Sequence, residues 1–175
     1  MSFINRAHAC GMMTLLVVCS LSWSDASAEE IGSIEDRLAI AEQLAQYSYR
    51  WDSKDSEGFA DLFTEDGVME RRLGGALVSG SRVVGRQAIF DYAKGSHEGR
   101  LADRQTRHHM SALVFLELST DVAVTENMAL ITHQTADDRV PFISGSGIYR
   151  NTWRKTDQGW KIAERVLFTD RFTGQ

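Results

Sequence analysis

Cysteine is almost missing from this chain of 175 residues, which contains only Cys10 and Cys19, both close to the N-terminus. A domain built from the residues after Cys19 therefore has no disulfide, no thiol nucleophile and no cysteine-based metal site. Its stability must come from a buried core or from oligomerisation. Proline is equally scarce, with Pro141 alone, and the chain shows no internal repeat or low-complexity tract.

An excess of positive charge is also absent, because 19 Lys and Arg residues face 24 Asp and Glu residues, for a net charge of −5. A nucleic-acid-binding domain would show a basic stripe, so we expect no nucleic-acid partner. The chain has neither a glycine-rich phosphate loop followed by Lys-Ser/Thr nor a Gly-x-Ser-x-Gly nucleophile elbow. What is present, 43% hydrophobic and 25% charged residues, is typical of one soluble domain.

The N-terminal segment has the layout of a secretory signal peptide. Arg6 supplies a positive charge, residues 11–21 form an apolar run too short to span a bilayer, and Ala26-Ser27-Ala28 resembles a cleavage site. We therefore expect residues 1–28 to be a signal peptide and residues 29–175 to be one domain. That domain would be secreted or periplasmic and free of the membrane after cleavage; the lack of disulfides fits a bacterial periplasm as well as the exterior.

Helical spacing dominates the first part of the predicted domain. Ser33 is a candidate N-cap with Asp36 three positions later, so a helix is expected from Ile34 to Trp51. Its expected inner side consists of residues that recur at helical spacing: Ile34, Leu38, Ala41, Leu44, Ala45 and Ser48. Two shorter helices are expected over residues 57–63 and 86–94, and residues 95–105 are expected to form a polar loop.

From Thr106 onward the pattern becomes that of β-strands. Strands are expected near residues 107–118, 121–135, 142–155 and 159–170, after an earlier hairpin that joins 68–73 to 76–84. Helices followed by a run of antiparallel strands indicate an α+β fold. We expect a cone-shaped α+β barrel, in which three N-terminal helices pack on a curved, mostly antiparallel sheet and leave a conical cavity between them.

Asp52, His108 and His133 stand at the ends of predicted elements that could share this cavity. Histidine titrates near neutrality, and a carboxylate can hold its tautomer and stabilise the imidazolium, so the three residues predict a proton-transfer site. Asp52 is also suited to capping the next helix, and His133 to a solvent-facing position near a turn. His108 and His109 are neighbours on one strand, so only one of them faces the cavity.

Five short motifs occur in an order and at spacings that resemble the SnoaL-like group of the nuclear-transport-factor-2-like superfamily. They are Phe63-Thr64-Glu65-Asp66-Gly67, Gly85-Arg86-Gln87-Ala88-Ile89, Thr106-Arg107-His108, Gly147-Ile148-Tyr149 and Gly159-Trp160-Lys161-Ile162. The resemblance covers about residues 34–172. It implies a cone-shaped fold, an active site that works without metal or cofactor, and a homodimer or homotrimer.

Within that group the site resembles the scytalone dehydratases. The stretch Asp52-Ser53-Lys54-Asp55 matches the surroundings of their catalytic aspartate, while His108 and His133 stand where their two catalytic histidines stand. The resemblance therefore implies that Asp52, His108 and His133 are catalytic and that His108, not His109, faces the cavity. A dehydrochlorinase of the same fold also resembles this chain at Asp52 and His108.

Three further residues are candidates for contact with a substrate. Trp51 and Arg71 replace two tyrosines of the scytalone dehydratases, which implies a different substrate, and Tyr149 belongs to a strand that would line the cavity. Trp51 directly precedes the candidate acid, so a place in the pocket wall is reasonable. For Arg71 and also for Arg165, an ordinary surface or interface charge is the simpler interpretation.

Together these residues predict a cofactor-independent lyase of the dehydratase type, acting on a small apolar or cyclic substrate. His108 would remove a proton, Asp52 would orient His108, and His133 would protonate a leaving hydroxyl or hydrogen-bond an enolate. The alternatives are an isomerase, cyclase or hydrolase on the same fold, or a non-catalytic small-ligand-binding protein. A second inward carboxylate, Glu70 or Glu126, would favour the hydrolase. No metal site is expected, since no His-x-His or His-x-x-x-His spacing occurs.

Overall fold

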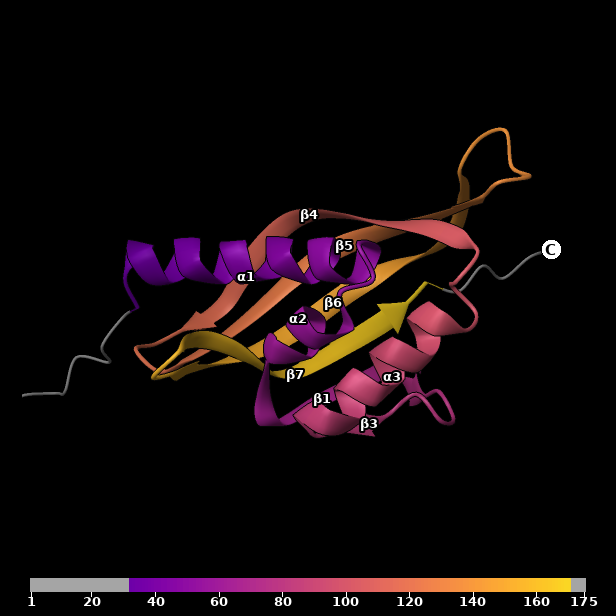
Figure 1. Cartoon of the computed structure of the whole chain (residues 1–175). Helices are drawn as coiled ribbons and strands as arrows, with labels where there is room; N and C mark the ends of the chain where they lie inside the picture. Colours follow the sequence, from indigo (N-terminus) through magenta and orange to yellow (C-terminus); the bar gives the residue numbers. More distant parts are fainter. Residues whose placement is uncertain (1–31, 171–175) are drawn as a thin grey trace, which may run out of the picture.

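The computed structural model describes residues 32–170, which form three helices and one curved sheet (Figure 1). In chain order the elements are α1 (Ile34–Asp52), α2 (Ser56–Asp61), β1 (Phe63–Leu73), β2 (Ala76–Leu77), β3 (Val83–Val84), α3 (Arg86–Glu98), β4 (Arg104–Leu118), β5 (Val122–Thr135), β6 (Phe142–Thr156) and β7 (Gly159–Thr169). The predicted signal peptide, residues 1–28, lies outside the described residues together with both cysteines. Within residues 32–170, no helix is both long and apolar enough to cross a bilayer.

The sheet has the order β2-β1-β7-β6-β5-β4, and β3 pairs with β1 beside β2. Among the strands of residues 32–170, only β1 and β7 pair in parallel, so the expected α+β fold with a mostly antiparallel sheet is confirmed. On β4 the register shifts between Ser111 and Val114, where Ala112 has a φ of 53°. Such a bulge bends a strand, and the long strands curve around α1, as Figure 1 shows.

Asp36 links the start of α1 to the hairpin between β6 and β7. The carboxylate of Asp36 accepts hydrogen bonds from the Ser33 backbone N–H and hydroxyl, which completes the predicted capping box. It also accepts from Lys155 Nζ and Trp160 Nε1, each at 2.8 Å, on the β6–β7 hairpin. These contacts set the direction of α1, whose other end carries Asp52.

The inner side of α1 differs from the predicted one. Ile34 and Leu38 are 69% and 67% exposed, so their placement in the core was wrong. Leu44 is buried as predicted, but the other buried apolar residues of the helix are Ile40, Tyr47 and Trp51. Both stripes have helical spacing, and the sheet decides which one is covered, because the larger aromatic surface of the second stripe fills the space above the strands.

Several predicted boundaries also move. The third helix continues to Glu98 rather than ending at residue 94, because Ser96 and His97 in its last turn are buried. The second helix ends at Asp61, and Phe63 already belongs to β1. The returning strand expected over residues 76–84 is divided into β2 and β3. These changes leave the order of the elements as predicted.

His97 joins α3 to α2 from a buried position. Its Nδ1 lies 2.7 Å from Ser56 Oγ, its ring lies 4.7 Å from that of Trp51, and its Nε2 has no hydrogen-bond partner among the described residues. Burial, with the nearby charges of Lys54 and Arg100, lowers the pKa of His97 below its usual value. The imidazole is therefore neutral in the folded protein near pH 7.

We expect acidification to destabilise the protein through His97. The unfolded chain takes up a proton near pH 6.5, whereas the folded chain resists it until a lower pH, so the free energy of unfolding falls as the pH drops below about 7. Urea unfolding at pH 7 and pH 5 should show a smaller drop for His97→Asn than for the parent protein. His109→Asn, a change at an exposed histidine, should leave the drop unchanged; equal drops in all three proteins would contradict the prediction.

Candidate active site

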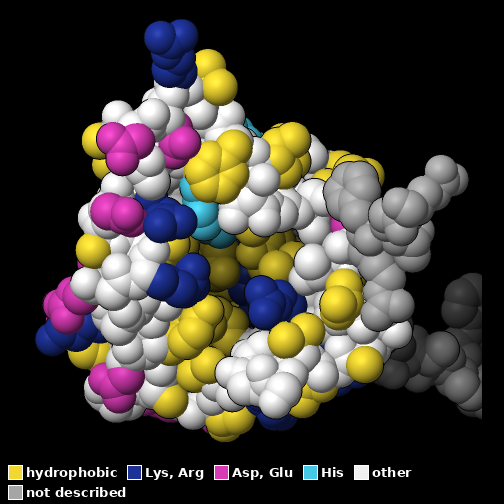
Figure 2. Space-filling model, turned by 90° about the vertical axis from the view of Figure 1, so that its right-hand side faces the viewer, with side chains coloured by type: hydrophobic (Ala, Val, Ile, Leu, Met, Phe, Trp, Pro, Cys, Tyr) yellow, Lys and Arg dark blue, Asp and Glu magenta, His cyan; other side chains and the backbone are white. Residues whose placement is uncertain are grey.

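A cavity of about 520 Å³ lies between the helices and the concave face of the sheet. α1, α3 and the long strands all contribute side chains to its wall. Figure 2 shows the open end of the molecule, where the surface is hollowed, hydrophobic side chains lie inside, and Lys, Arg and His side chains lie around the opening. The cavity is thus large enough for a small organic molecule and mixed in polarity.

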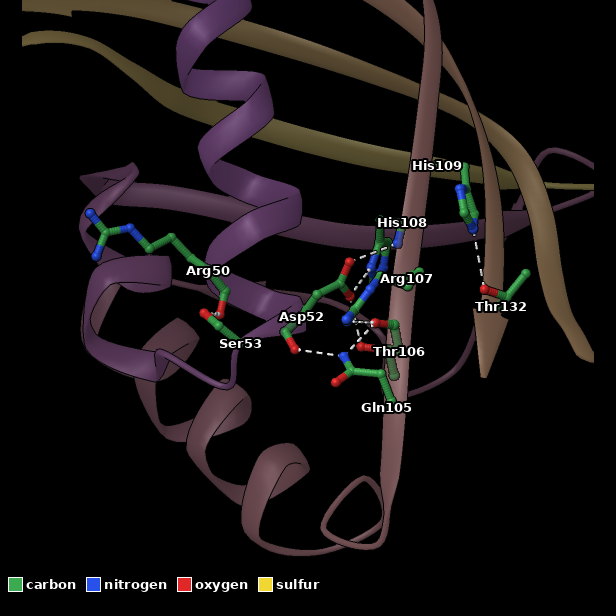
Figure 3. A network of polar contacts seen from close by, with 9 residues as sticks. All are labelled: Arg50, Asp52, Ser53, Gln105, Thr106, Arg107, His108, His109 and Thr132. Atoms are coloured by element: carbon green, nitrogen blue, oxygen red, sulfur yellow. Dashed lines mark hydrogen bonds and ion pairs between the residues drawn. The ribbon is translucent and has the colours of Figure 1, made fainter. Parts of the chain in front are cut away.

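Asp52, the last residue of α1, meets the start of β4 beside this cavity (Figure 3). Its Oδ1 lies 2.8 Å from His108 Nδ1 and accepts a hydrogen bond of 2.7 Å from Thr106 Oγ1. Its Oδ2 accepts the backbone N–H of His108 at 2.8 Å, and Gln105 Nε2 donates to its backbone carbonyl. Three contacts therefore fix the carboxylate against β4, and a fourth holds the backbone of Asp52. Asp52 does not cap α2, whose N-cap is Asp55.

The electrostatics of Asp52 define the tautomer of His108. Burial by itself raises the pKa of Asp52, but hydrogen bonds from His108, Thr106 and the His108 backbone bring the net pKa below the usual value. The carboxylate is therefore ionised at pH 7 and can only accept hydrogen bonds. The proton of the neutral imidazole consequently resides on Nδ1, which leaves the lone pair of Nε2 for a ligand.

His108 lines the cavity, and His109 does not. The rings of Tyr47 and Trp51 stand edge-on to the imidazole of His108, at 6.2 Å and 6.3 Å between centroids. His109 points to the opposite side of β4, where its Nε2 lies 3.2 Å from Thr132 Oγ1 (Figure 3). The alternation of side chains along the strand separates the two neighbours.

His133 on β5 lines the same cavity, opposite Thr106 in the strand register. No hydrogen bond links its ring to Asp52 or His108 within residues 32–170, so it stands apart from their pair. Burial, followed by the charges of Arg104 and His108, lowers the pKa of His133. His133 is therefore a neutral imidazole near pH 7, with one N–H to donate.

The three predicted substrate contacts also lie in the cavity wall: Trp51, Arg71 and Tyr149. Trp51 is buried at the end of α1, while Arg71 is exposed near the opening. Burial and the neighbouring Tyr47 raise the pKa of Tyr149 well above its usual value, so its phenol stays protonated.

Arg165 is the residue whose position the sequence analysis undervalued. It is 1% exposed and lines the cavity, so the simpler interpretation as a surface or interface charge was wrong. Its guanidinium lies between the rings of Tyr47 and Tyr149, 3.6 Å from each centroid, and donates through Nη1 to Asn151 Oδ1. Stacking on two aromatic faces offsets part of the cost of burying the cation.

Of the two candidate second carboxylates, Glu70 lines the cavity, whereas Glu126 pairs with Arg150 outside it. Both oxygens of Glu70 are held by arginines, with Arg72 Nε at 2.7 Å and Arg82 on the other oxygen. Within residues 32–170, no group of three or more His, Cys, Asp or Glu side chains is arranged to hold a metal ion.

The fold therefore places a carboxylate–imidazole pair, Asp52 and His108, beside a cavity between the helices and the curved sheet. The model of the SnoaL-like domain matches residues 32–166, and the chain belongs to this family. No protein with a curated description matches the chain significantly.

Solved structures with the same fold include three informative relatives. A Mycobacterium tuberculosis protein of unknown function is 31% identical, covers 79% of this chain and 74% of its own, and has a TM-score of 0.67. An NTF2-like protein with a cystatin-like fold from Novosphingobium aromaticivorans is 25% identical, with coverages of 81% and 84% and a TM-score of 0.66. A protein of the same organism, provisionally assigned as a scytalone dehydratase, is 26% identical, with coverages of 79% and 89% and a TM-score of 0.65. The expected SnoaL-like family and NTF2-like fold are confirmed, in a group that includes provisional dehydratases.

Proposed function

We propose that this protein is a cofactor-independent lyase of the dehydratase type, which removes water from a small cyclic hydroxyketone. The observation that carries the proposal is the pairing of Asp52 with His108 Nδ1 at 2.8 Å, in a side chain that lines the cavity. This pairing supplies a base with a defined tautomer. The provisional assignment of a structural relative as a scytalone dehydratase supports the same reaction class.

In the proposed reaction, His108 Nε2 removes a proton from the carbon next to the ketone. The positive charge that forms on the imidazole is stabilised by the Asp52 carboxylate. The resulting enolate expels the hydroxyl group from the neighbouring carbon, and the hydroxyl leaves as water with the proton that His108 has taken up. One proton and one hydroxyl group are thus removed from the substrate, and a double bond forms.

His133 is proposed to assist the departure of the hydroxyl group. As a neutral imidazole in the same cavity, it donates a hydrogen bond through its N–H to the hydroxyl oxygen or to the enolate. Tyr149, whose phenol remains protonated, is a second donor in the wall. Trp51 supplies an apolar surface for the substrate ring.

A hydrolase is less well supported than a lyase on this cavity. It would use a free carboxylate to activate water, but both oxygens of Glu70 are engaged by arginines. An isomerase or a cyclase would use the same proton transfer from carbon as the proposed lyase. A non-catalytic binding protein would need no proton transfer.

The direct test is an incubation of the protein with 3-hydroxycyclohexanone and substituted relatives in D₂O. We expect loss of water to give the cyclohexenone, measured by its ultraviolet absorbance, and faster exchange of the hydrogens next to the ketone, measured by NMR. Exchange without water loss would favour an isomerase. Binding of the ketones with neither exchange nor water loss would contradict the enzyme and favour the binding protein.

The remaining expectations stay predictions. They are export to the periplasm or exterior, a small-molecule ligand, and assembly as a homodimer or homotrimer. The outer face of the sheet exposes apolar side chains suited to such an assembly: Val114, Leu116, Met128, Leu130 and Ile148.

A further inference from the structure

The cavity contains a buried cation whose hydrogen-bonding capacity is only partly used. Arg165 is 1% exposed, and its Nη1 donates to Asn151 Oδ1, but its Nε and Nη2 have no partner among the described residues. No carboxylate in residues 32–170 forms an ion pair with it. A buried charge normally has an ionic partner, because removing the charge from water is costly.

The aromatic neighbours of Arg165 hold the guanidinium but do not neutralise it. The rings of Tyr47 and Tyr149 each have their centroid 3.6 Å from the guanidinium carbon, and the two rings are inclined at 61° to each other. Aromatic faces attract the cation but carry no net charge, so the positive charge remains. A guanidinium is complementary in charge and shape to a carboxylate.

The other charges of the cavity wall reinforce this preference. Arg71 and Arg100 also line the cavity, whereas the carboxylate of Glu70 is held by two other arginines and that of Asp52 is held against His108. The unpaired charge facing a ligand is therefore positive. Figure 2 shows dark blue side chains around the hollow.

We propose that the ligand is an anion, a carboxylate carried on a six-membered ring, which the uncompensated charge of Arg165 attracts into the adjoining part of the cavity. Tyr47 contacts both Arg165 and the ring of His108, so a ring-sized molecule bound to Arg165 lies next to the base. This inference rests on the proposed small-molecule site and names its substrate class. It concerns binding, so it holds or fails independently of water loss.

The test compares two probes that differ in charge but hardly in shape, 3-hydroxybenzoate and 3-hydroxybenzamide. Binding to the purified protein is measured by calorimetry and by quenching of tryptophan fluorescence, because Trp51 lines the cavity. We expect the benzoate to bind at least about 10-fold more tightly than the amide, since hydrogen bonds to a charged group are the stronger ones.

Two variants assign that preference to Arg165. Arg165→Met removes the cation, and Asn151→Asp keeps the cation and the shape but supplies an internal carboxylate at the atom that already accepts from Nη1. Both should abolish the preference for the benzoate. The matched control is Arg150→Met, at an exposed arginine that pairs with Glu126 outside the cavity, and it should keep the preference.

The second variant complements the first because asparagine and aspartate have nearly the same volume, although the change removes the hydrogen bonds that Asn151 Nδ2 donates to Thr125 and Asn127. Equal affinities of the parent protein for the two probes, or no binding of either, would overturn the proposal. So would a preference that survives in a folded Asn151→Asp protein. A lyase of neutral ketones would show water loss without this preference, and an anion-binding protein would show the preference without water loss.

Discussion

Replacing His108 by glutamine should reduce kcat/KM for water loss by about 10²–10⁴-fold, the usual contribution of a placed general base. Glutamine keeps a polar side chain of similar length but cannot take up a proton near neutral pH. The loss should appear mainly in kcat, because the proton is transferred in the transition state. Steady-state kinetics with the best ketone of the panel would measure it, and exchange in D₂O should be lost in parallel.

The neighbouring histidine offers a matched control. His109→Gln changes the same residue type one position away, on the outer face of β4, and should leave kcat/KM within about twofold of the parent value, as is usual for a substitution away from the reacting groups. If His108→Gln retained full activity, His108 could not be the base. Equal losses in both variants would indicate damage to β4 instead of loss of proton transfer.

Replacing Asp52 by asparagine should be nearly as damaging, although the shape of the side chain is kept. The amide nitrogen would face His108 Nδ1 and donate to it, since the remaining amide oxygen is needed by the His108 backbone N–H. The imidazole would then carry its proton on Nε2, and the lone pair would be turned away from the cavity. We expect a loss of about 10²–10⁴-fold in kcat, the scale of a lost general base.

Thr106→Val separates this tautomer effect from simple loss of a hydrogen bond. It removes the hydroxyl that donates to Asp52 Oδ1 but leaves the carboxylate beside His108. Its activity should fall by only about 10-fold or less, the scale of one hydrogen bond. The interpretation fails if Asp52→Asn behaves like Thr106→Val, because the carboxylate would then be no more than one hydrogen-bonding group among several.

Much of the fold could be predicted from local patterns. The capping pair Ser33 and Asp36 marked the start of α1, and long alternating segments marked β4 to β7, because these signals depend on residues close together in the chain. The meeting of Asp52 with His108 depended on a family resemblance, since 56 positions separate them. No local rule brings such residues together.

The inner face of α1 shows where local patterns are insufficient. Two apolar stripes had helical spacing and share Leu44, but Ile34 and Leu38 of the predicted stripe are exposed. A helix buries the face that its neighbours cover, and Asp36 fixes that face by binding Lys155 and Trp160 from the other end of the chain. Contacts between distant segments of the chain therefore decide which face of α1 is buried.

The orientation of Arg165 in the site is a second feature that local sequence patterns do not predict. Alternation from Trp160 and Ile162 along β7 would turn Glu164 inward and Arg165 outward. The register instead changes by one residue at Ala163, because Ile162 pairs with Trp153 and Glu164 with Thr152. This bulge turns Arg165 into the cavity.

The sequence by itself thus determined the α+β class, the order of the elements and that only one histidine of the adjacent pair faces inward, because each follows from spacing along the chain. The tertiary structure alone decided which stripe of α1 is buried, and it supplied the contacts by which Asp52 holds His108. It also decided that Arg165, whose Nε and Nη2 have no hydrogen-bond partner within residues 32–170, lies in the cavity wall. The physical reason is that these features depend on strand register and on packing between distant segments, which no local pattern encodes.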